Sequence, residues 1–145
     1  MLTRFEDWSS RLEAAIDAAR GAPTGYAPGE NHCCLFSGDL VLAMTGTDVM
    51  AWFRGRYKNE RGAYLALKRH AGAGLEKTVE KISVEFQVPE VPVNYAQRGD
   101  WVLHDEAHTH DLGAGICVGS RFVTVLHPAG VVFLPMSKAL RAWRI

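Results

Sequence analysis

The sequence predicts one α+β domain, with helices in residues 1–83 and a small antiparallel sheet in residues 84–145. In the first part, apolar residues recur at spacings of three and four, the period of a helix that buries one face. After residue 83 the apolar stretches become short, β-rich and separated by turn residues. Helices followed by strands are typical of the α+β class. The 145 residues, 48% of them hydrophobic, support one core without disulfides or a structural metal.

Five helical segments are expected in the first part. A capping box of Thr3 and Glu6 starts the first helix, whose apolar residues run from Phe5 to Ala19, and Gly21 ends it. An apolar-rich run that ends at a glycine then indicates a second, buried helix. The expected segments are 5–19, 33–44 with a start near Asn31 or His32, a short helix 48–53 capped by Asp48, 59–70 capped by Asn59, and 75–82.

The second part predicts a meander of short strands. The turn at residues 128–130 separates the last two of them. Ser137 is expected to cap a final helical turn that carries Leu140 and Trp143, and Arg98-Gly99-Asp100 is interpreted as a polar turn before a strand. The expected strands are 84–88, 101–105, 114–118, 121–126 and 130–134.

Composition and charge exclude several classes of protein. The 16 basic and 16 acidic side chains balance, so the chain lacks the basic excess of proteins that bind nucleic acid through its phosphates. No apolar run reaches 18 residues, so no membrane span is expected. The N-terminus lacks the pattern of a secretory signal, and the spacing of the three cysteines favours reduced thiols. Nucleotide-binding and paired-cysteine zinc motifs are also missing, so no cofactor is expected.

Cys33 is the main candidate for chemistry. A loop containing Tyr26 and Gly29 leads to Cys33 at the expected start of a buried helix. At such a position the backbone N–H groups and the helix dipole stabilise a thiolate, which is a common way to make a nucleophile. The alternative is that Cys33 and Cys34 only fill the core, because unpaired cysteines are among the most buried residues.

The order of several motifs resembles that of the papain-like NlpC-type cell-wall peptidases. The resemblance rests on 26–34, 98–103 and 115–119. A second set of motifs resembles a family of unknown function, encoded among phage and prophage tail genes and thought to be divergent NlpC-like domains. These motifs are Phe5-Glu6-Asp7-Trp8, Thr45-Gly46-Thr47-Asp48, Phe53-Arg54-Gly55-Arg56-Tyr57 and Arg141-Ala142-Trp143-Arg144-Ile145. The resemblance implies a papain-like (NlpC-type) α+β fold over residues 1–145.

The resemblance also implies site residues, and two of them are changed here. Cys33 matches the nucleophile, but the aspartate that usually precedes it is His32. The usual position of the general-base histidine is Gly113, and glycine supplies no imidazole. Two substitutes are considered for catalysis, His110 near the start of that strand and His127 at the end of the next one. Either another histidine reaches the thiol, or the domain is no longer a peptidase.

The segment from His104 to Asp111 allows three interpretations. The simplest is a solvated polar turn between two strands, and the second is the source of a catalytic histidine such as His110. The third is a metal site, because His104, His108 and His110 alternate with carboxylates that suit zinc or another divalent ion. We expect no metal, because a strand and turn would bring only two of these imidazoles to one face.

The leading functional hypothesis is a structural phage tail protein with a degenerate peptidase site. On this hypothesis the chain is made in the host cytoplasm without a signal peptide and resides in the virion tail. Its partners would be distal tail, hub or tip proteins. The alternative is an active cysteine hydrolase that cuts the peptide stems of peptidoglycan during genome entry, with Cys33 as nucleophile and His110 or His127 as base. A metal-binding domain is the third hypothesis.

Overall fold

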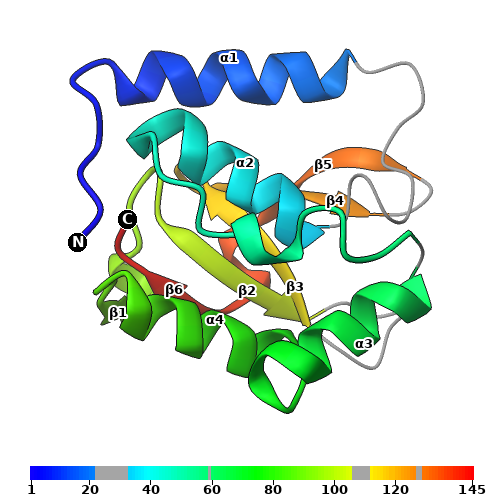
Figure 1. Cartoon of the computed structure of the whole chain (residues 1–145). Helices are drawn as coiled ribbons and strands as arrows, with labels where there is room; N and C mark the ends of the chain where they lie inside the picture. The colour runs from blue at the N-terminus through cyan, green and yellow to red at the C-terminus, as the bar shows by residue number, and fades with distance from the viewer. Residues whose placement is uncertain (22–32, 59, 106–111, 127–128) are drawn as a thin grey trace.

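The computed structural model describes residues 1–21, 33–58, 60–105, 112–126 and 129–145, and it confirms the predicted α+β fold. Helices occupy the first part of the chain (Figure 1). Among the described residues, none of these helices has the length and apolar character needed to cross a membrane. The helices are α1 (Trp8–Arg20), α2 (Cys33–Thr45), α3 (Glu60–Ala71) and α4 (Leu75–Glu85), with short 3-10 helices η1 (Ala51–Phe53), η2 (Val93–Tyr95) and η3 (Met136–Lys138).

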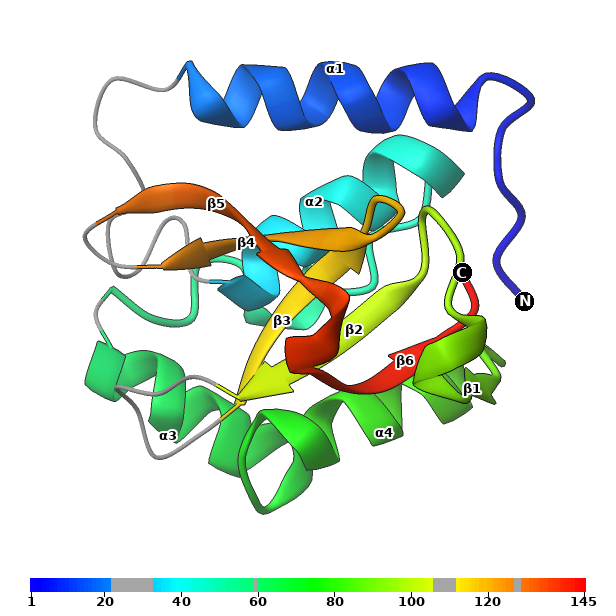
Figure 2. The same cartoon turned by 180° about the vertical axis from the view of Figure 1, so that it is seen from behind.

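The sheet is antiparallel, and its strand order is β1-β6-β2-β3-β4-β5. From β2 to β5 it is the predicted meander, and the chain then returns through η3 so that β6 pairs with the free edge of β2 (Figure 2). The strands are β1 (Glu90–Val91), β2 (Trp101–Asp105), β3 (Leu112–Cys117), β4 (Arg121–Leu126), β5 (Gly130–Pro135) and β6 (Ala139–Trp143).

The predicted start of the first helix is wrong by three residues. Helix α1 begins at Trp8, and Asp7 rather than Thr3 occupies the N-cap position. The segment before it is held elsewhere, because the amide of Phe5 donates to the carbonyl of Met44 at the end of α2. A capping box is a local pattern, and this long-range contact overrides it.

Two predictions in the second part are also wrong. Residues 84–88 do not form a strand, because Val84 and Glu85 complete α4 and the amide of Phe86 still donates to the carbonyl of Ile82. The final helical turn after Ser137 is instead the strand β6. Its register places Trp143 opposite Trp101, so the two largest fully buried side chains are neighbours on one face of the sheet. Burying both indoles and pairing the β2 edge outweighs the local preference for a turn.

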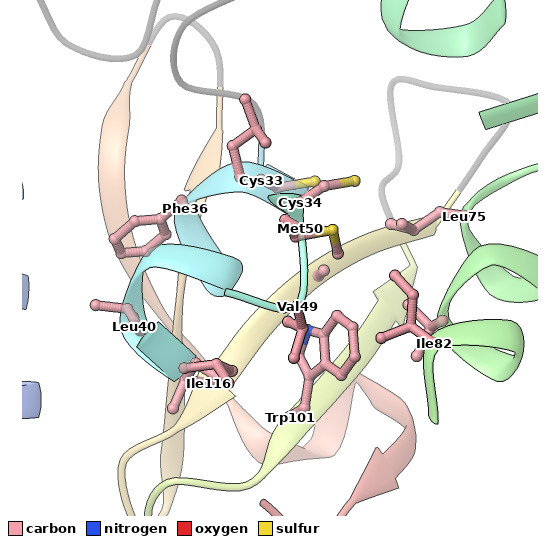
Figure 3. Close-up of a cluster of buried hydrophobic side chains, with 14 of the residues drawn as sticks. Cys33, Cys34, Phe36, Leu40, Val49, Met50, Leu75, Ile82, Trp101 and Ile116 are labelled. Atoms are coloured by element: carbon pink, nitrogen blue, oxygen red, sulfur yellow. The ribbon is translucent and has the colours of Figure 1, made fainter. Parts of the chain in front are cut away.

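The two faces of the sheet carry separate apolar clusters. Helix α2 packs against β3 and β4 on one face, over the large cluster that contains Leu40, Trp101 and Ile116 (Figure 3). The opposite face carries a smaller cluster of Val102, Cys117, Phe122 and Ala142. Side chains along β2 alternate between these faces, as the two-residue period of a strand requires. Helices α2 and α4 contribute to the large cluster on one face, while Leu134, Met136 and Ala139 pack against the smaller cluster on the other.

The fully buried carboxylate of Asp100 joins both chain ends to the start of β2. It accepts hydrogen bonds from Arg4 Nη2 at 3.2 Å, from Arg144 Nε at 2.9 Å and from the backbone amide of Gln97 at 2.8 Å. Arg4 also donates to the backbone carbonyl of Ile145 at 2.8 Å. Two cations and one amide therefore satisfy a charge that would otherwise be costly to bury. We call this group, Arg4, Asp100 and Arg144, the Asp100 clamp.

Removing the clamp carboxylate is expected to destabilise the domain strongly. Asp100→Ala leaves two partly buried guanidinium groups without their acceptor, and breaking a buried ion pair from one side costs about 3–5 kcal/mol. Urea denaturation measures the change in the free energy of unfolding. Asp7→Ala is the matched control, because its pair with Arg11 is exposed and is worth less than about 1 kcal/mol. Equal losses in the two variants would contradict the role of the clamp.

Candidate functional site

Cys33 is the first residue of α2, close to the start that the sequence predicts near Asn31 or His32, and it is only 4% exposed. Figure 3 shows Cys33 and Cys34 at the start of the helix, beside the large apolar cluster. The first N–H groups of a helix have no intrahelical acceptor, and they form the positive end of its dipole. All three cysteines, Cys117 included, are reduced and buried. Both Cys33 and Cys34 are thus buried, as the core-filling alternative expects, and Cys33 also lies where a thiolate would be stabilised.

Two contacts fix the start of α2 on the sheet. The indole Nε1 of Trp101 on β2 donates to Ser37 Oγ at 3.0 Å, and Ser37 Oγ donates in turn to the carbonyl of Cys34 at 3.0 Å. On another side of the helix, a Cβ added at Gly38 would lie 2.5 Å from Cγ of Met50. The missing side chain at Gly38 therefore lets the segment after α2 pack directly on the helix. These buried contacts set the position of Cys33 relative to β2.

Tyr57 is a second polar side chain near the cysteines. Its phenol is buried, and burial is the main reason why the pKa of Tyr57 lies well above its usual value. The negative charges of ionised Cys34 and Cys33 raise this pKa further. The phenol is therefore protonated at neutral pH, and it lies within electrostatic range of both sulfur atoms. In the sequence, Tyr57 is the last residue of the motif Phe53-Arg54-Gly55-Arg56-Tyr57, and nothing in that motif indicates that its side chain lies near the cysteines.

His104 occupies the space next to the position expected for the general base. Residue 104 on β2 is paired with Gly113 on β3, so the two positions are neighbours on the same face of the sheet. A Cβ added at Gly113 would lie 2.5 Å from Cε1 of His104 and still closer to Nε2. The imidazole of His104, which is 0% exposed, thus fills the volume that a side chain at position 113 would require.

Both ring nitrogens of His104 have oxygen neighbours. Nδ1 lies 3.2 Å from the carbonyl of Asp105, and Nε2 lies 3.3 Å from Thr124 Oγ1 on β4. The Thr124 hydroxyl donates to the carbonyl of Ala114 at 2.8 Å, so both neighbours of the ring are acceptors, and a neutral imidazole donates its one N–H either to the Asp105 carbonyl or to Thr124 Oγ1. The Phe122 ring packs on the imidazole with centroids 4.9 Å apart. The hydroxyl and the aromatic ring together fix the orientation of His104.

The protonation of His104 depends on competing effects. Burial lowers the pKa of this imidazole below its usual value, and this is the largest effect. The Asp105 carbonyl and the negative charge of an ionised Cys33 both raise it. Burial is the larger effect, so His104 is neutral near pH 7. The ring packs on Phe122, which belongs to the smaller cluster, so His104 lies on the face of the sheet opposite α2.

Most of the other predicted site residues lie in parts of the chain that the structure does not describe. His110 and His127, the two candidate bases, lie outside the described residues, as do His32 and His108, so their roles stay predictions. His104 belongs to the segment considered as a source of a catalytic histidine and as a metal site, and its ring nitrogens lie near an amide carbonyl and a hydroxyl. Within the described ranges, no three His, Cys, Asp or Glu side chains are grouped to hold a metal ion.

Comparison with known proteins supports the fold. A family model described as "Domain of unknown function (DUF6950)" matches residues 3–145. Among solved structures, the NlpC/p60 domain of the peptidoglycan hydrolase SagA is similar, with a TM-score of 0.57 and 14% identity over 94% of this chain and 97% of that chain. No curated protein matches. At this identity the likeness shows the fold alone, and it confirms the expected NlpC-like, papain-like architecture.

The crowded pair of Gly113 and His104 generates a stability prediction. Gly113→Ala pushes a methyl group into the buried imidazole, and overpacking of this kind costs about 1–3 kcal/mol. The same change made together with His104→Ala is expected to cost much less, because the ring is gone. The unfolding free energies of the single and double variants measure this coupling. Gly21→Ala is the control, because its added methyl would meet only atoms at ordinary contact distance. Additive effects of the two substitutions would exclude the crowding.

Proposed function

Because the chain belongs to this family of unknown function and has an NlpC-like fold, we propose that it is a cysteine hydrolase that cuts amide bonds, with Cys33 as nucleophile. The observation that carries the proposal is the placement of Cys33 at the start of α2, tied to β2 through Ser37 and Trp101. A thiol that served only to fill the core would not require the positive end of a helix dipole.

The chemistry follows from that position. The ionised sulfur of Cys33 attacks the carbonyl carbon of an amide, and the N–H groups at the start of α2 stabilise the oxyanion that forms. The C–N bond breaks as the leaving amine takes up a proton, and a thioester to Cys33 remains. Water then hydrolyses the thioester and regenerates the thiol. The peptide stems of peptidoglycan are the proposed substrates, because the similar solved structure is a domain of a peptidoglycan hydrolase.

A structural role in a phage tail is the second candidate. It is favoured by the burial of Cys33 and by the lack of a side chain at position 113. On this proposal the domain contacts distal tail, hub or tip proteins in the virion and catalyses nothing. Mass spectrometry of purified virions tests it: a protein that resides in the tail is found in stoichiometric amounts, and particles that carry Cys33→Ala infect normally. Particles that lack the protein would exclude this role.

The hydrolase proposal predicts activity that depends on one of three cysteines. Purified protein is expected to release free amine groups from isolated peptidoglycan, and Cys33→Ala is expected to reduce this release at least 1,000-fold, because no nucleophile remains. Cys117→Ala is the control, because Cys117 lies in the smaller cluster on the opposite face of the sheet and should retain activity. Activity that survives Cys33→Ala, in protein that unfolds at the wild-type temperature, would exclude the mechanism.

A further inference from the structure

We propose that the outer face of α3 binds a linear polymer of phosphodiester-linked sugars or polyols, the class of anionic polymer found in cell walls. This face consists of Arg61, Tyr64, Leu65, Lys68 and Arg69, which are all exposed, and we call it the basic face. The choice of a wall polymer rests on the hydrolase function proposed above, because an enzyme that cuts peptidoglycan works within the wall. The binding of a polyanion is argued from the basic face itself.

Helix α3 has a buried apolar side and an exposed basic side. Ala63, Ala66 and Leu67 recur at spacings of three and one, lie on one side of the helix, and are at most 4% exposed. On the other side, the two apolar members of the basic face remain in solvent, with Tyr64 50% and Leu65 40% exposed. The apolar side of α3 is therefore used within the domain, and the basic face is left for a partner.

Positive charge is concentrated around this helix, although the whole chain is neutral. Residues 54–69 contain six of the 16 basic side chains and only one acidic side chain, and residues 61–71 contain no aspartate or glutamate. Arg54 is paired with Asp39 and Asp48. In the parts of the chain that the structure describes, the three cations of the basic face form no ion pair. Their charges are therefore available to an anionic ligand.

The stability of the helix does not explain the position of Arg61. Lys68 and Arg69 lie in the last turn of α3, where a cation interacts favourably with the negative end of the helix dipole. Arg61 is the second residue of the helix, at the positive end, where the same interaction is unfavourable. An anion bound along the basic face would reverse this effect, because it would bring negative charge to the start of the helix.

The cations form a row, which suits a linear polyanion. Arg61 and Lys68 are separated by about two helical turns, or about 10 Å along the axis. A small anion would need donors that converge on one point, whereas a polymer gains affinity with each additional charge that it contacts. A membrane surface fits less well, because the apolar side of α3 is buried in the domain and only Tyr64 and Leu65 could enter the lipid.

The side chains of the basic face match the two chemical parts of such a polymer. The guanidinium groups of Arg61 and Arg69 present paired N–H donors that fit the oxygens of a phosphate. Lys68 Nζ lies 5.5 Å from the centre of the Tyr64 ring, so an exposed aromatic surface lies beside a cation. The apolar body of this ring can pack on the C–H groups of a sugar or polyol. Phosphates and carbon units alternate along the polymer, as cations and apolar side chains do along the face.

The basic face lies at a useful end of the molecule. In Figures 1 and 2, α3 is at the same end as the start of α2, which carries Cys33, and α1 lies on the far side of α2. A wall polymer held on α3 would therefore keep the end of the domain that carries the nucleophile close to the wall.

The proposal is tested by the binding of poly(glycerol phosphate) to the full-length protein, measured by surface plasmon resonance over a range of salt concentrations. A triple variant with Arg61→Gln, Lys68→Gln and Arg69→Gln is expected to bind at least tenfold more weakly at 50 mM salt. Its affinity should also depend less steeply on salt, with the slope of log K against log salt reduced by about two, because fewer counterions are released. Circular dichroism confirms that the variant is folded.

A second triple variant controls for net charge. Arg20→Gln, Arg121→Gln and Lys138→Gln remove three exposed cations from other parts of the surface, so the protein carries the same total charge as the first variant. Its affinity is expected to stay within twofold of the wild-type value. Equal losses in the two triple variants, or no binding of the polymer by the wild-type protein, would overturn the proposal.

The aromatic contact has its own variant. Tyr64→Ser is expected to weaken binding at least threefold without changing the salt dependence, because it removes packing and no charge. Tyr95→Ser is the matched control, since Tyr95 is 71% exposed but belongs to η2, and it should leave binding unchanged. If Tyr64→Ser binds as the wild type does, the face recognises charge alone, and the assignment of a sugar- or polyol-phosphate polymer is wrong.

Two further probes test the identity of the polymer. A DNA duplex and vesicles of phosphatidylglycerol are measured against the same variants, and either one overturns the proposal if it binds the basic face more tightly than poly(glycerol phosphate) does. The result is separable from the proposed function. If the polymer binds through the basic face but no peptidoglycan is cut, this inference stands and the hydrolase proposal fails. If Cys33-dependent cleavage is observed but the polymer does not bind, the hydrolase proposal stands and this inference fails.

Discussion

The buried charge of Asp100 is the constraint on which the arrangement of the sheet depends. A carboxylate with no exposed surface must be matched by donors, and the chain brings them from both of its ends, from Arg4 and Arg144. The N-terminal segment before α1 is not helical, and from there Arg4 reaches both Asp100 and the carbonyl of Ile145. The C-terminal segment is a strand beside β2, and Arg144 follows directly after β6.

The clamp is coupled to the site through one strand. Asp100 immediately precedes Trp101, whose indole is hydrogen-bonded to Ser37 in the first turns of α2. Three residues further along β2 lies His104. The register that satisfies the buried carboxylate therefore also sets the start of the cysteine helix and the position of the imidazole. Trp101 and His104 lie on different faces of the sheet, and a register shift of one residue would turn each of them to the other face. This register is therefore strongly specified.

The sequence predicts the parts of this fold that local patterns determine. The strand limits 101–105 and 121–126 agree with β2 and β4, and Cys33 lies in the first turn of α2 as expected. The errors occur where a distant contact decides the structure. The polar turn before β2 contains Asp100, and nothing in the local sequence indicates that its carboxylate is buried between two arginines from the chain ends. The strand β6 is likewise stabilised by its pairing with β2, which no local pattern around Ser137 indicates.

At the candidate site, too, contacts between residues distant in sequence decide what local patterns cannot predict. A sequence motif assigns the role of general base to one position in the chain. Because that position is Gly113 here, the motif indicates that the imidazole is lost. In space, the group next to that position belongs to the paired strand, and His104 fills the volume that glycine vacates. Chemistry depends on where an imidazole lies and not on which strand supplies it. At position 113 the neighbour across the sheet is a histidine, but its ring packs on Phe122, on the face of the sheet opposite α2, so filling the vacated volume does not by itself supply a base to Cys33.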